Sequence, residues 1–358
     1  MGANKSMRGR KADHLRICLR KRRYTVETGS TWLDEIRLVH RSLPEMNAAD
    51  IDTTVMFLGR PISMPIFISS MTGGSAGGFR ANKNLAQVAQ EAGIPVGLGS
   101  IRILFRNPEV IEHFLLRPLA PDVPIFANIG GVQLRTDNFE PLVELIKRLE
   151  VDGLAVHLNV GQELVQPEGD SSFFGVLNGI ERLCEACPVP VIAKETGFGI
   201  NPAEAKSLLA AGVQYVDVAG RGGTNWAKVE AYRLPRESRG VANELESWGT
   251  PTALLLAATR AFDGSILASG GIRSGMDVAK SIALGAVAAG LALPFIRAVA
   301  RGGVEAGVAV AERIRDVLHT AMLLTGSRTV ADLRSAQVLE SMEFAHAVSQ
   351  LKQLSGVA

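Results

Sequence analysis

Short apolar runs alternate with amphipathic stretches along the chain from about residue 65 onward. The apolar runs are rich in Val, Ile, Ala and Leu, and Gly, Pro or polar residues bound them. Runs that are apolar throughout are typical of strands in a parallel sheet covered on both faces. We expect eight such strands, at Pro65–Ser69, Val96–Gly99, Ile125–Asn128, Gly153–His157, Pro190–Glu195, Tyr215–Val218, Ile266–Ser269 and Ala288–Leu291.

The stretches between these runs carry helical patterns. Their apolar residues recur at the spacing of one helix face, and each stretch ends near a glycine or a new strand. The expected helices are Asn82–Ala92, Pro141–Leu149, Ala203–Ala211, Thr252–Ala261 and Met276–Leu284. Eight strands alternating with helices favour an α/β fold of the closed (β/α)8 TIM-barrel type over an open, doubly wound sheet.

The barrel pattern leaves a segment at each end of the chain. Residues 1–64 form an N-terminal extension, and the barrel unit 65–358 ends in a helical region after Pro294. The length of 358 residues does not by itself decide between one domain and two, but no linker rich in Pro, Ser or Gly separates the segments. The longest connections, Asn159–Gly175 and Gly220–Gly249, are typical of lids or binding elements.

Composition narrows the class of protein. The net charge of +2 gives no reason to expect nucleic acid or an anionic membrane as a partner. No apolar run is long enough to span a bilayer, and the N-terminus lacks the apolar core of a signal peptide, so we expect a cytoplasmic protein. The three cysteines suit a reducing compartment. Cys184 and Cys187 have a spacing that suggests metal or redox work, but without a second pair a structural role is favoured.

A polar loop follows the fourth strand, between His157 and Asp170. It carries an imidazole, the amides of Asn159 and Gln162, and three carboxylates, of which Glu163 is the first. In a parallel α/β fold, ligands bind where strands end. Donor groups beside carboxylates suit a diphosphate held with a divalent cation, because phosphate and carboxylate oxygens can share one magnesium. The alternative is an ordinary hydrophilic loop with a solvated histidine.

Unusual residues also follow the other strands. They include Met71–Gly74, Gly99–Arg102, Asn128, Lys194–Glu195, Gly220–Asn225 and Ser269–Arg273. In a barrel all of these meet on one rim, and the glycines after the seventh strand offer N–H groups to an anion at a helix start. Lys194 is the most informative, since a buried ammonium usually has an anionic partner. That partner is either a ligand or a nearby carboxylate such as Glu195.

The order and spacing of these motifs resemble the type 2 isopentenyl-diphosphate isomerases, a family of FMN-dependent barrels. The likeness runs from Arg10 to Phe295. The motifs that carry it are Arg10-Lys11-Ala12-Asp13-His14, Met71-Thr72-Gly73-Gly74, His157-Leu158-Asn159 with Gln162-Glu163, Lys194-Glu195, Gly222-Gly223-Thr224, Trp248-Gly249-Thr250-Pro251-Thr252 and Gly270-Gly271-Ile272-Arg273. Leu293 stands where the family often has Gly or Arg.

The resemblance implies a reversible double-bond shift between isopentenyl and dimethylallyl diphosphate, with FMN reduced by NADPH, and a homo-oligomer, either a tetramer or an octamer. Gln162 and His157 would be the catalytic residues, and Glu163 would hold Mg²⁺. The substrate would contact Arg10, Lys11, Ser100, Arg102, His157, Asn159 and Gln162. FMN would contact Met71, Thr72, Gly73, Ser100, Asn128, Lys194, Thr224, Gly270, Gly271, Ile272, Arg273, Ala292 and Leu293.

The resemblance changes the interpretation of the N-terminus, where Lys and Arg crowd residues 5–23. By itself such crowding is typical of a disordered, solvated tail. The resemblance instead assigns Arg10 and Lys11 to the substrate diphosphate. We still expect the segment to lack a fixed position without substrate, and its deletion to leave a folded barrel that holds flavin.

Two rival functions are considered. A 2-hydroxy-acid oxidase is also an FMN barrel, but the oxidases that it resembles need a histidine before the glycine pair after the sixth strand. Arg221 occupies that place here, and no histidine occurs between Cys184 and Gly303. The second rival is a non-catalytic protein that binds flavin or an isoprenoid diphosphate, which the presence of both Gln162 and Glu163 disfavours.

Overall fold

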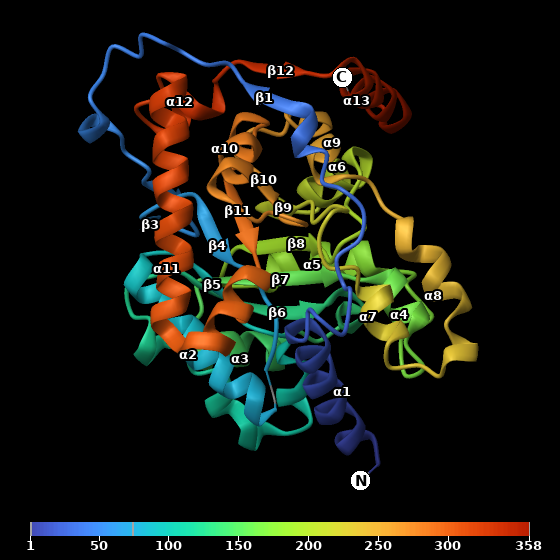
Figure 1. Cartoon of the computed structure of the whole chain (residues 1–358). Coiled ribbons are helices and arrows are strands. Elements are labelled where there is room, and N and C mark those ends of the chain that lie inside the picture. The colour runs from blue at the N-terminus through green and yellow to red at the C-terminus, as the bar shows by residue number, and fades with distance from the viewer. Residues whose placement is uncertain (1, 74, 358) are drawn as a thin grey trace.

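The computed structural model describes residues 2–73 and 75–357, with the side chains of the first helix described from residue 9 onward, so Gly74 of the expected glycine turn lies outside the described residues. A closed barrel of parallel strands forms its centre, in the order β10-β11-β4-β5-β6-β7-β8-β9 (Figure 1). The strands are β4 (Ile66–Ile68), β5 (Val96–Gly97), β6 (Ile125–Gly130), β7 (Gly153–Leu158), β8 (Val191–Glu195), β9 (Tyr215–Asp217), β10 (Ile266–Ala268) and β11 (Ala288–Leu291). The predicted (β/α)8 barrel is confirmed, with every strand in its expected place.

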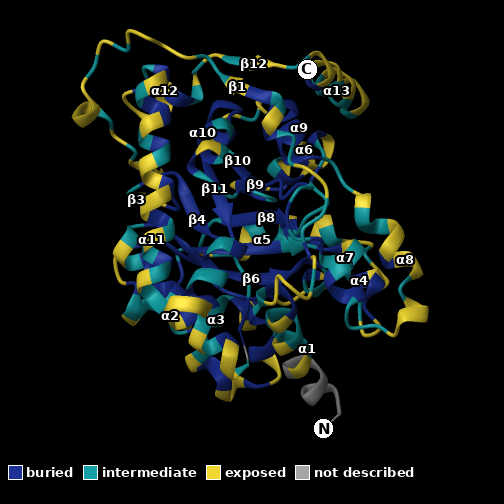
Figure 2. Ribbon diagram, viewed as in Figure 1, coloured by how far each residue is buried: buried dark blue, intermediate teal, exposed yellow. Residues whose placement is uncertain are grey.

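Helices surround the barrel and bury one face against it (Figure 2). They are α2 (Ala76–Ala92), α3 (Glu140–Leu149), α4 (Val160–Val165), α5 (Val176–Ala186), α6 (Pro202–Ala210), α7 (Trp226–Ala231), α8 (Gly240–Glu244), α9 (Thr252–Ala258), α10 (Gly275–Ala283), α11 (Leu293–Thr325), α12 (Val330–Arg334) and α13 (Met342–Ser355). The five predicted helices are confirmed, although α2 begins six residues before its expected start at Asn82 and the ends of the others shift by at most three residues. Side-chain caps explain two starts: the Ser274 hydroxyl accepts from the Asp277 amide, and Asn201 likewise accepts from Glu204.

Short 3₁₀ helices lie in several of the connections. They are η1 (Leu33–Glu35), η2 (Ala48–Asp50), η3 (Ile101–Phe105), η4 (Pro108–His113), η5 (Arg117–Leu119), η6 (Gly131–Leu134), η7 (Arg236–Ser238) and η8 (Leu245–Ser247). Three of them, η3 to η5, fill the connection between β5 and β6. Pro108 and Pro118 interrupt any longer helix there, because proline has no N–H to donate.

The N-terminal extension closes one end of the barrel. Strands β2 (Val55–Phe57) and β3 (Arg60–Ile62) form an antiparallel hairpin. Phe57 is fully buried, and its ring lies 5.9 Å from that of Phe67 and 5.2 Å from that of Tyr215. Tyr215 begins β9, so this aromatic cluster lies at the amino ends of the strands. A further strand of the extension, β1 (Ile36–Leu38), pairs with β12 (Val338–Glu340) near the other terminus.

The basic N-terminal segment corrects one expectation. Helix α1 (Gly2–Leu19) occupies it, and Ile17 and Cys18 on that helix are buried, with 1% and 8% exposure. Its contacts are with α2, α7 and α11, and the ring of His14 lies 5.1 Å from that of Trp226. The expectation of a segment without a fixed position is therefore wrong for its described part. Deleting residues 1–23 would also remove buried apolar contacts, so point substitutions test this arm better.

Helix α11 is long but not straight. Gly302 and Gly303 break its backbone, and Gly303 has φ 66° and ψ −152°, a conformation open to glycine alone. Within the described chain, no helix combines the length and apolarity needed to cross a bilayer.

Candidate active site

The carboxyl ends of the barrel strands surround one cavity, which brings together most of the residues predicted for the site. Its lining includes Arg10, Lys11, Met71, Ser100, Arg102, Asn128, His157, Asn159, Gln162, Glu163, Lys194, Thr224, Gly270, Gly271, Arg273, Ala292 and Leu293. Thr72 lines an adjoining small apolar cavity with Met71 and Leu293. Gly73 lies instead against the Phe114 ring, and the Ile272 side chain is fully buried in the core, so neither of these predicted cofactor contacts lines the cavity.

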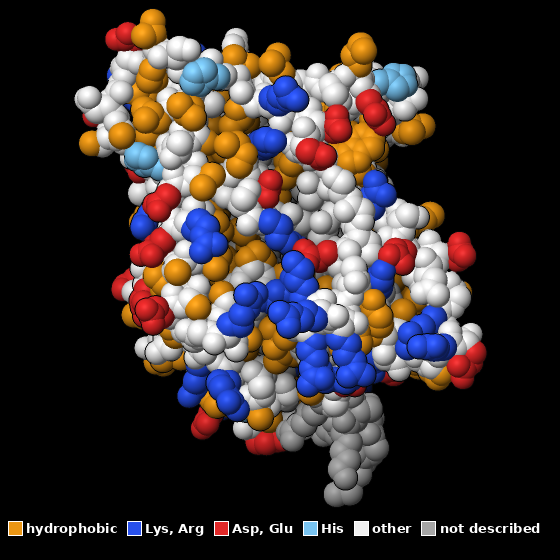
Figure 3. Space-filling model, viewed as in Figure 1, with side chains coloured by type: hydrophobic (Ala, Val, Ile, Leu, Met, Phe, Trp, Pro, Cys, Tyr) orange, Lys and Arg blue, Asp and Glu red, His pale blue; other side chains and the backbone are white. Residues whose placement is uncertain are grey.

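Three cations gather at the mouth of this cavity. Arg10 comes from α1, Arg102 from η3, and their carboxylate partners Glu168 and Asp170 are both 3.8 Å away. Lys11 donates from Nζ to the Ser100 carbonyl at 3.1 Å. Figure 3 shows Lys and Arg side chains gathered on the face that carries α1.

These cations are close enough to affect one another. Burial, and then the charges of Arg10 and Arg102, lower the pKa of Lys11 to about 7. Cations that are loosely paired and partly desolvated favour an anionic ligand with several oxygens, such as a diphosphate.

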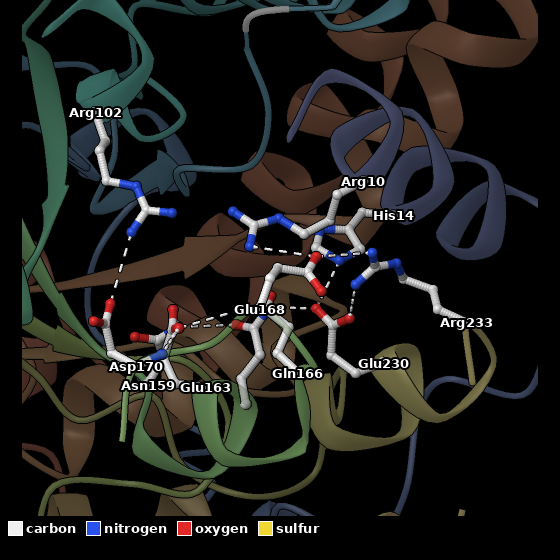
Figure 4. Close-up of polar contacts among 11 residues, drawn as sticks. Arg10, His14, Arg102, Asn159, Glu163, Gln166, Glu168, Asp170, Glu230 and Arg233 are labelled. Carbon is white, nitrogen blue, oxygen red and sulfur yellow. Dashed lines mark hydrogen bonds and ion pairs between the residues drawn. The ribbon is translucent and has the colours of Figure 1, made fainter. Parts of the chain in front are cut away.

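The carboxylate of Glu163 lies across the site from Arg10 and Arg102, in the first turn of α4 (Figure 4). It is 8% exposed, and Asn159 Nδ2 donates to its Oε1 at 3.1 Å. Its Oε2 accepts from Gln166 Nε2 at 3.2 Å and from the Asp170 amide at 3.0 Å. These donors hold the orientation of the carboxylate.

A buried carboxylate on α7, Glu230, fixes the amide of Gln162. Gln162 Nε2 donates to Glu230 Oε1 at 3.0 Å, and Gln162 Oε1 accepts from Asn159 at 3.2 Å. His14 Nε2 lies 2.7 Å from the same Glu230 oxygen, and Arg233 donates to the other. Burial raises the pKa of Glu230, but the hydrogen bonds from His14, Gln162 and Arg233 and the nearby His14 ring lower it to about 2. Glu230 therefore stays charged and presents Gln162 in one orientation.

Sequence reasoning missed Glu230 and Arg233. They lie 68 and 71 residues after Gln162 in the long connection that follows β9, so no spacing links them to it. A faint signal was present in His14, which closes the basic entry motif and contacts Glu230 here.

His157 at the end of β7 is held by its neighbour on β6. Its Nδ1 lies 2.7 Å from Asn128 Oδ1, an oxygen that can only accept, so Nδ1 carries the proton and Nε2 is free to accept. Burial, followed by the charges of Lys194 and Arg102, lowers the pKa of His157 to about 3. The imidazole is therefore neutral at ordinary pH.

Lys194 on β8 is buried in the cavity wall, with 8% exposure. The alternative of a salt bridge to Glu195 is wrong, because the Glu195 carboxylate accepts from the amides of Gly197 at 2.6 Å and Gly199 at 3.0 Å. Lys194 Nζ instead donates to the Glu195 carbonyl at 2.7 Å. The neighbour of Lys194 on the adjacent strand β9 is Asp217, whose Oδ2 accepts a hydrogen bond from Ser269 Oγ at 2.9 Å. Lys194 retains donor capacity toward the cavity.

Several features of the rim fit FMN. Gly270 has φ 92°, and a Cβ there would lie 2.1 Å from the Gly220 carbonyl oxygen, so only glycine lets these two loops meet. Helices α10 and α11 begin just after the β10 and β11 loops and direct backbone N–H groups toward the phosphate position usual in this fold. The guanidinium of Arg273 is already paired with Glu27 at 2.7 Å.

Two hydroxyls that sequence reasoning missed also point to a polar ligand. Ser69 Oγ and Ser70 Oγ line the cavity, are buried, and have no hydrogen-bond partner in the part of the chain that the structure describes. The same holds for Thr72 Oγ1, which was predicted. Buried polar groups normally have partners, so these hydroxyls suit a ligand that carries polar atoms, as the flavin ring does.

The residues present fit a magnesium site only if the substrate supplies some of the ligands. No cluster of three or more His, Cys, Asp or Glu side chains that could hold a metal occurs within residues 2–73 and 75–357. Magnesium is commonly held by one or two carboxylates together with substrate phosphates. Glu163, facing the three cations that would hold a diphosphate, fits that arrangement. Cys184 and Cys187 are not joined by a disulfide.

Comparison with known proteins defines the class first. The family model described as FMN-dependent dehydrogenase matches residues 3–104 and 163–340, so fold and site define a flavin barrel. A mandelate oxidase solved with (S)-mandelic acid superimposes with a TM-score of 0.65 over 93% of this chain and 95% of its own, at 18% identity, a likeness of fold. The stretch that the family model does not match, 105–162, carries Asn128, His157 and Gln162.

Curated relatives define the family within that class. The chain is 41% identical over 357 residues to the isopentenyl-diphosphate delta-isomerase of Borreliella afzelii, covering 99% of this chain and 100% of the relative. It is 43% identical to the enzyme of that name from Halobacterium salinarum, covering 92% of each. The chain therefore belongs to the isopentenyl-diphosphate delta-isomerase family, and the resemblance stated from the sequence is confirmed.

Proposed function

We propose that this chain interconverts isopentenyl diphosphate and dimethylallyl diphosphate for isoprenoid biosynthesis, with reduced FMN bound in the barrel mouth. The names of its relatives and the matching FMN-dependent family model support this function. The structural observation that carries it is the amide of Gln162, held by the buried Glu230 and facing a cavity that also contains the cation cluster. One group can thereby face the carbon skeleton while others hold the diphosphate.

The diphosphate would lie among the cations of the mouth. We assign it to Arg10, Lys11, Ser100, Arg102, His157 and Asn159, while Gln162 lies near the isoprenoid carbons of the substrate. Glu163 would share a Mg²⁺ ion with the diphosphate oxygens, since magnesium prefers such anionic ligands. Fixing one end of a small substrate turns binding energy into positioning, which contributes about 7–11 kcal/mol in well-oriented systems. In this arrangement residues 1–64 carry the substrate-binding arm and residues 65–358 form the FMN-binding barrel.

FMN would contact Met71, Thr72, Gly73, Ser100, Asn128, Lys194 and Thr224, with its phosphate near Gly270, Gly271, Ile272, Arg273, Ala292 and Leu293. Of these, Gly73 and Ile272 have only their backbones to offer, given where their side-chain positions lie. When bound and reduced by NADPH, FMN supplies an electron-rich ring that can exchange a proton without net electron transfer.

The double-bond shift adds a proton at one carbon and removes one from another. Gln162 and His157 are the side chains that we assign to this step. His157 is neutral, and because Nδ1 donates to Asn128, its Nε2 can accept a hydrogen bond from water or from a protonated oxygen of the diphosphate. Glu230 is a positioning residue, which keeps the Gln162 amide turned toward the substrate end of the cavity. We also propose a cytoplasmic homo-oligomer, a tetramer or an octamer.

One contact counts against oxidation of a 2-hydroxy acid. Arg221, which stands where the oxidases need their histidine, donates to the Ser247 carbonyl at 3.0 Å and does not line the cavity. No base for that reaction therefore occupies this position.

The test is anaerobic incubation of the purified protein with isopentenyl diphosphate, Mg²⁺, FMN and NADPH, followed by detection of dimethylallyl diphosphate. A parallel incubation of oxidised flavoprotein with 2-hydroxy acids, without NADPH, should leave the flavin oxidised. Flavin reduction by a 2-hydroxy acid would favour the oxidase. Bound flavin with no dimethylallyl diphosphate and no oxidase reaction would favour a binding protein.

A further inference from the structure

A second hollow opens beside the active-site cavity and is continuous with it. The two share Arg10, Arg102 and Gln133 in their linings. The second hollow has a volume of about 610 Å³, against about 210 Å³ for the first. A five-carbon substrate held at the barrel mouth leaves this larger space without a role.

The walls of this groove combine an aromatic platform with positive charge. Phe105, at the end of η3, is 44% exposed and lines the groove. Arg106 follows it and is exposed on the same wall, while Phe139 and Leu142 form a buried floor. An open aromatic face next to a guanidinium suits a flat base that carries phosphate, because rings stack on such a face and Arg pairs with phosphate through two N–H groups.

Two arginines lie at the shared border of the two hollows, and the carboxylates of Glu168 and Asp170 also line the groove beside them. Arg10 Nε is buried and has no hydrogen-bond partner among the described residues, and the Arg102 guanidinium reaches only 3.8 Å from Asp170. In Figure 4 the side chains of Arg10 and Arg102 extend into the same space. A ligand that runs from the groove into the cavity must pass these two cations, so it would carry phosphate at that point as well.

We propose that the groove binds the adenosine end of NADPH, an assignment that rests on the proposed FMN-dependent function. Phe105 stacks on the adenine, Arg106 pairs with the 2′-phosphate, and the pyrophosphate lies beside Arg10 and Arg102. The nicotinamide then enters the barrel mouth. A hydride passes from the dihydronicotinamide to oxidised FMN and one proton comes from solvent, which gives NADP⁺ and reduced FMN. A longer isoprenoid diphosphate is the other occupant that the test must distinguish.

The experiment separates flavin reduction from isomerisation. Phe105→Ala and Arg106→Ala are compared with the parent and with Arg148→Ala, an exposed arginine on α3. Anaerobic bleaching of the flavin absorbance is followed against NADPH and against NADH, with 2′,5′-ADP as a competitor. Dimethylallyl diphosphate formation is measured separately with FMN reduced by dithionite.

Arg106→Ala should raise the NADPH concentration for half-maximal flavin reduction roughly tenfold or more and leave that for NADH unchanged, because one charge-assisted contact to the 2′-phosphate is lost. Phe105→Ala should raise the half-maximal concentrations of both NADPH and NADH. In the parent, 2′,5′-ADP should compete with NADPH. All variants should isomerise normally after dithionite reduction.

Parental NADPH dependence in both variants would overturn the proposal. The proposal would also be overturned if Phe105→Ala weakened the binding of geranyl diphosphate but not that of 2′,5′-ADP. A parent that is reduced by NADPH through this groove but forms no dimethylallyl diphosphate after dithionite reduction would instead defeat the proposed function.

Discussion

The two ends of the barrel are built from the same strands but from opposite kinds of residue. At the amino end, Phe57, Phe67, Phe126 and Tyr215 pack ring against ring under the β2–β3 hairpin. At the carboxyl end, the strands and the loops that follow them place His157, Lys194 and Ser269 around a cavity. Burying apolar rings stabilises the fold, whereas burying polar groups costs free energy unless they find partners.

The difference shows that one end of the barrel stabilises the fold and the other end binds the ligand. The aromatic end completes its own packing and needs no ligand. The polar end retains buried hydroxyls, Ser69 Oγ and Ser70 Oγ, that lack partners in the described chain, so its contacts are completed by what binds there. Changes at the two ends should therefore affect different measurements.

The largest expected effect is on stability, from Phe57→Ala. The Phe57 side chain is fully buried, and its removal leaves a cavity between the rings of Phe67 and Tyr215. We expect a loss of about 3–5 kcal/mol in the free energy of unfolding, measured by denaturant titration. The activity per folded molecule should stay at the parental level.

Phe174→Ala is the control, since that side chain is 94% exposed. If Phe57→Ala unfolds like this control, the aromatic end does not stabilise the barrel as described.

Glu163→Gln should have the next largest effect, and at the other end. The amide keeps the size of the side chain but removes the charge that magnesium favours. We expect Mg²⁺-dependent isomerisation to fall roughly a hundredfold or more, because the metal loses its anionic protein ligand, while FMN content is retained. Magnesium titration of the rate is the measurement. Glu181→Gln, an exposed carboxylate on α5, is the control, and a normal magnesium saturation curve in Glu163→Gln would remove Glu163 from the metal site.

The barrel could be predicted from the sequence because its strands are continuously apolar. Its helices have apolar residues at the spacing of one helix face and capping residues at their ends. For the same reason, the residues that directly follow strands, such as Asn128, His157 and Lys194, were placed correctly at one cavity. Chain direction alone brings the ends of parallel strands to one rim.

Other parts depend on contacts between distant residues, which no local pattern reveals. Glu230 meets Gln162 across 68 residues, and the β2–β3 hairpin meets the strand starts only after the barrel closes. Helix α1 has a weak apolar face, so its docked position comes from a few buried residues such as Ile17 and from the cavity that it borders. The crowded charges around these residues suggested a disordered tail, and tertiary packing overrode that signal.

A smaller effect is expected from Lys194→Ala on FMN binding. Lys194 is a buried cation in the cavity wall that Glu195 does not neutralise. Without it a bound ligand loses one charged donor, so FMN affinity should fall about ten- to a hundredfold. Titration of the apoprotein by flavin fluorescence quenching measures this change. Lys206→Ala on α6 is the exposed control. Unchanged affinity in Lys194→Ala would make Lys194 a structural partner of Asp217 alone.

The effect that is smallest at neutral pH is the pH dependence of stability that His157 causes. Its folded-state pKa of about 3 lies below the ordinary value of 6.5 because burial and nearby cations disfavour the charged ring. Between these two values the unfolded chain binds a proton that the folded protein does not. The contribution is therefore fully retained above pH 6.5 and is lost as the pH falls toward 3, with a slope of at most about 1.4 kcal/mol per pH unit.

His157→Asn should flatten this part of the stability profile, because asparagine takes up no proton in that range. The free energy of unfolding of the flavin-free protein, measured by denaturant titration at several pH values from 7 downward, provides the test. His346→Asn on α13 removes an exposed histidine instead and serves as the comparison. If both variants keep the parental slope, the ring of His157 gains its proton as easily in the folded protein as in the unfolded chain. A neutral imidazole could then no longer be assumed in the proposed site.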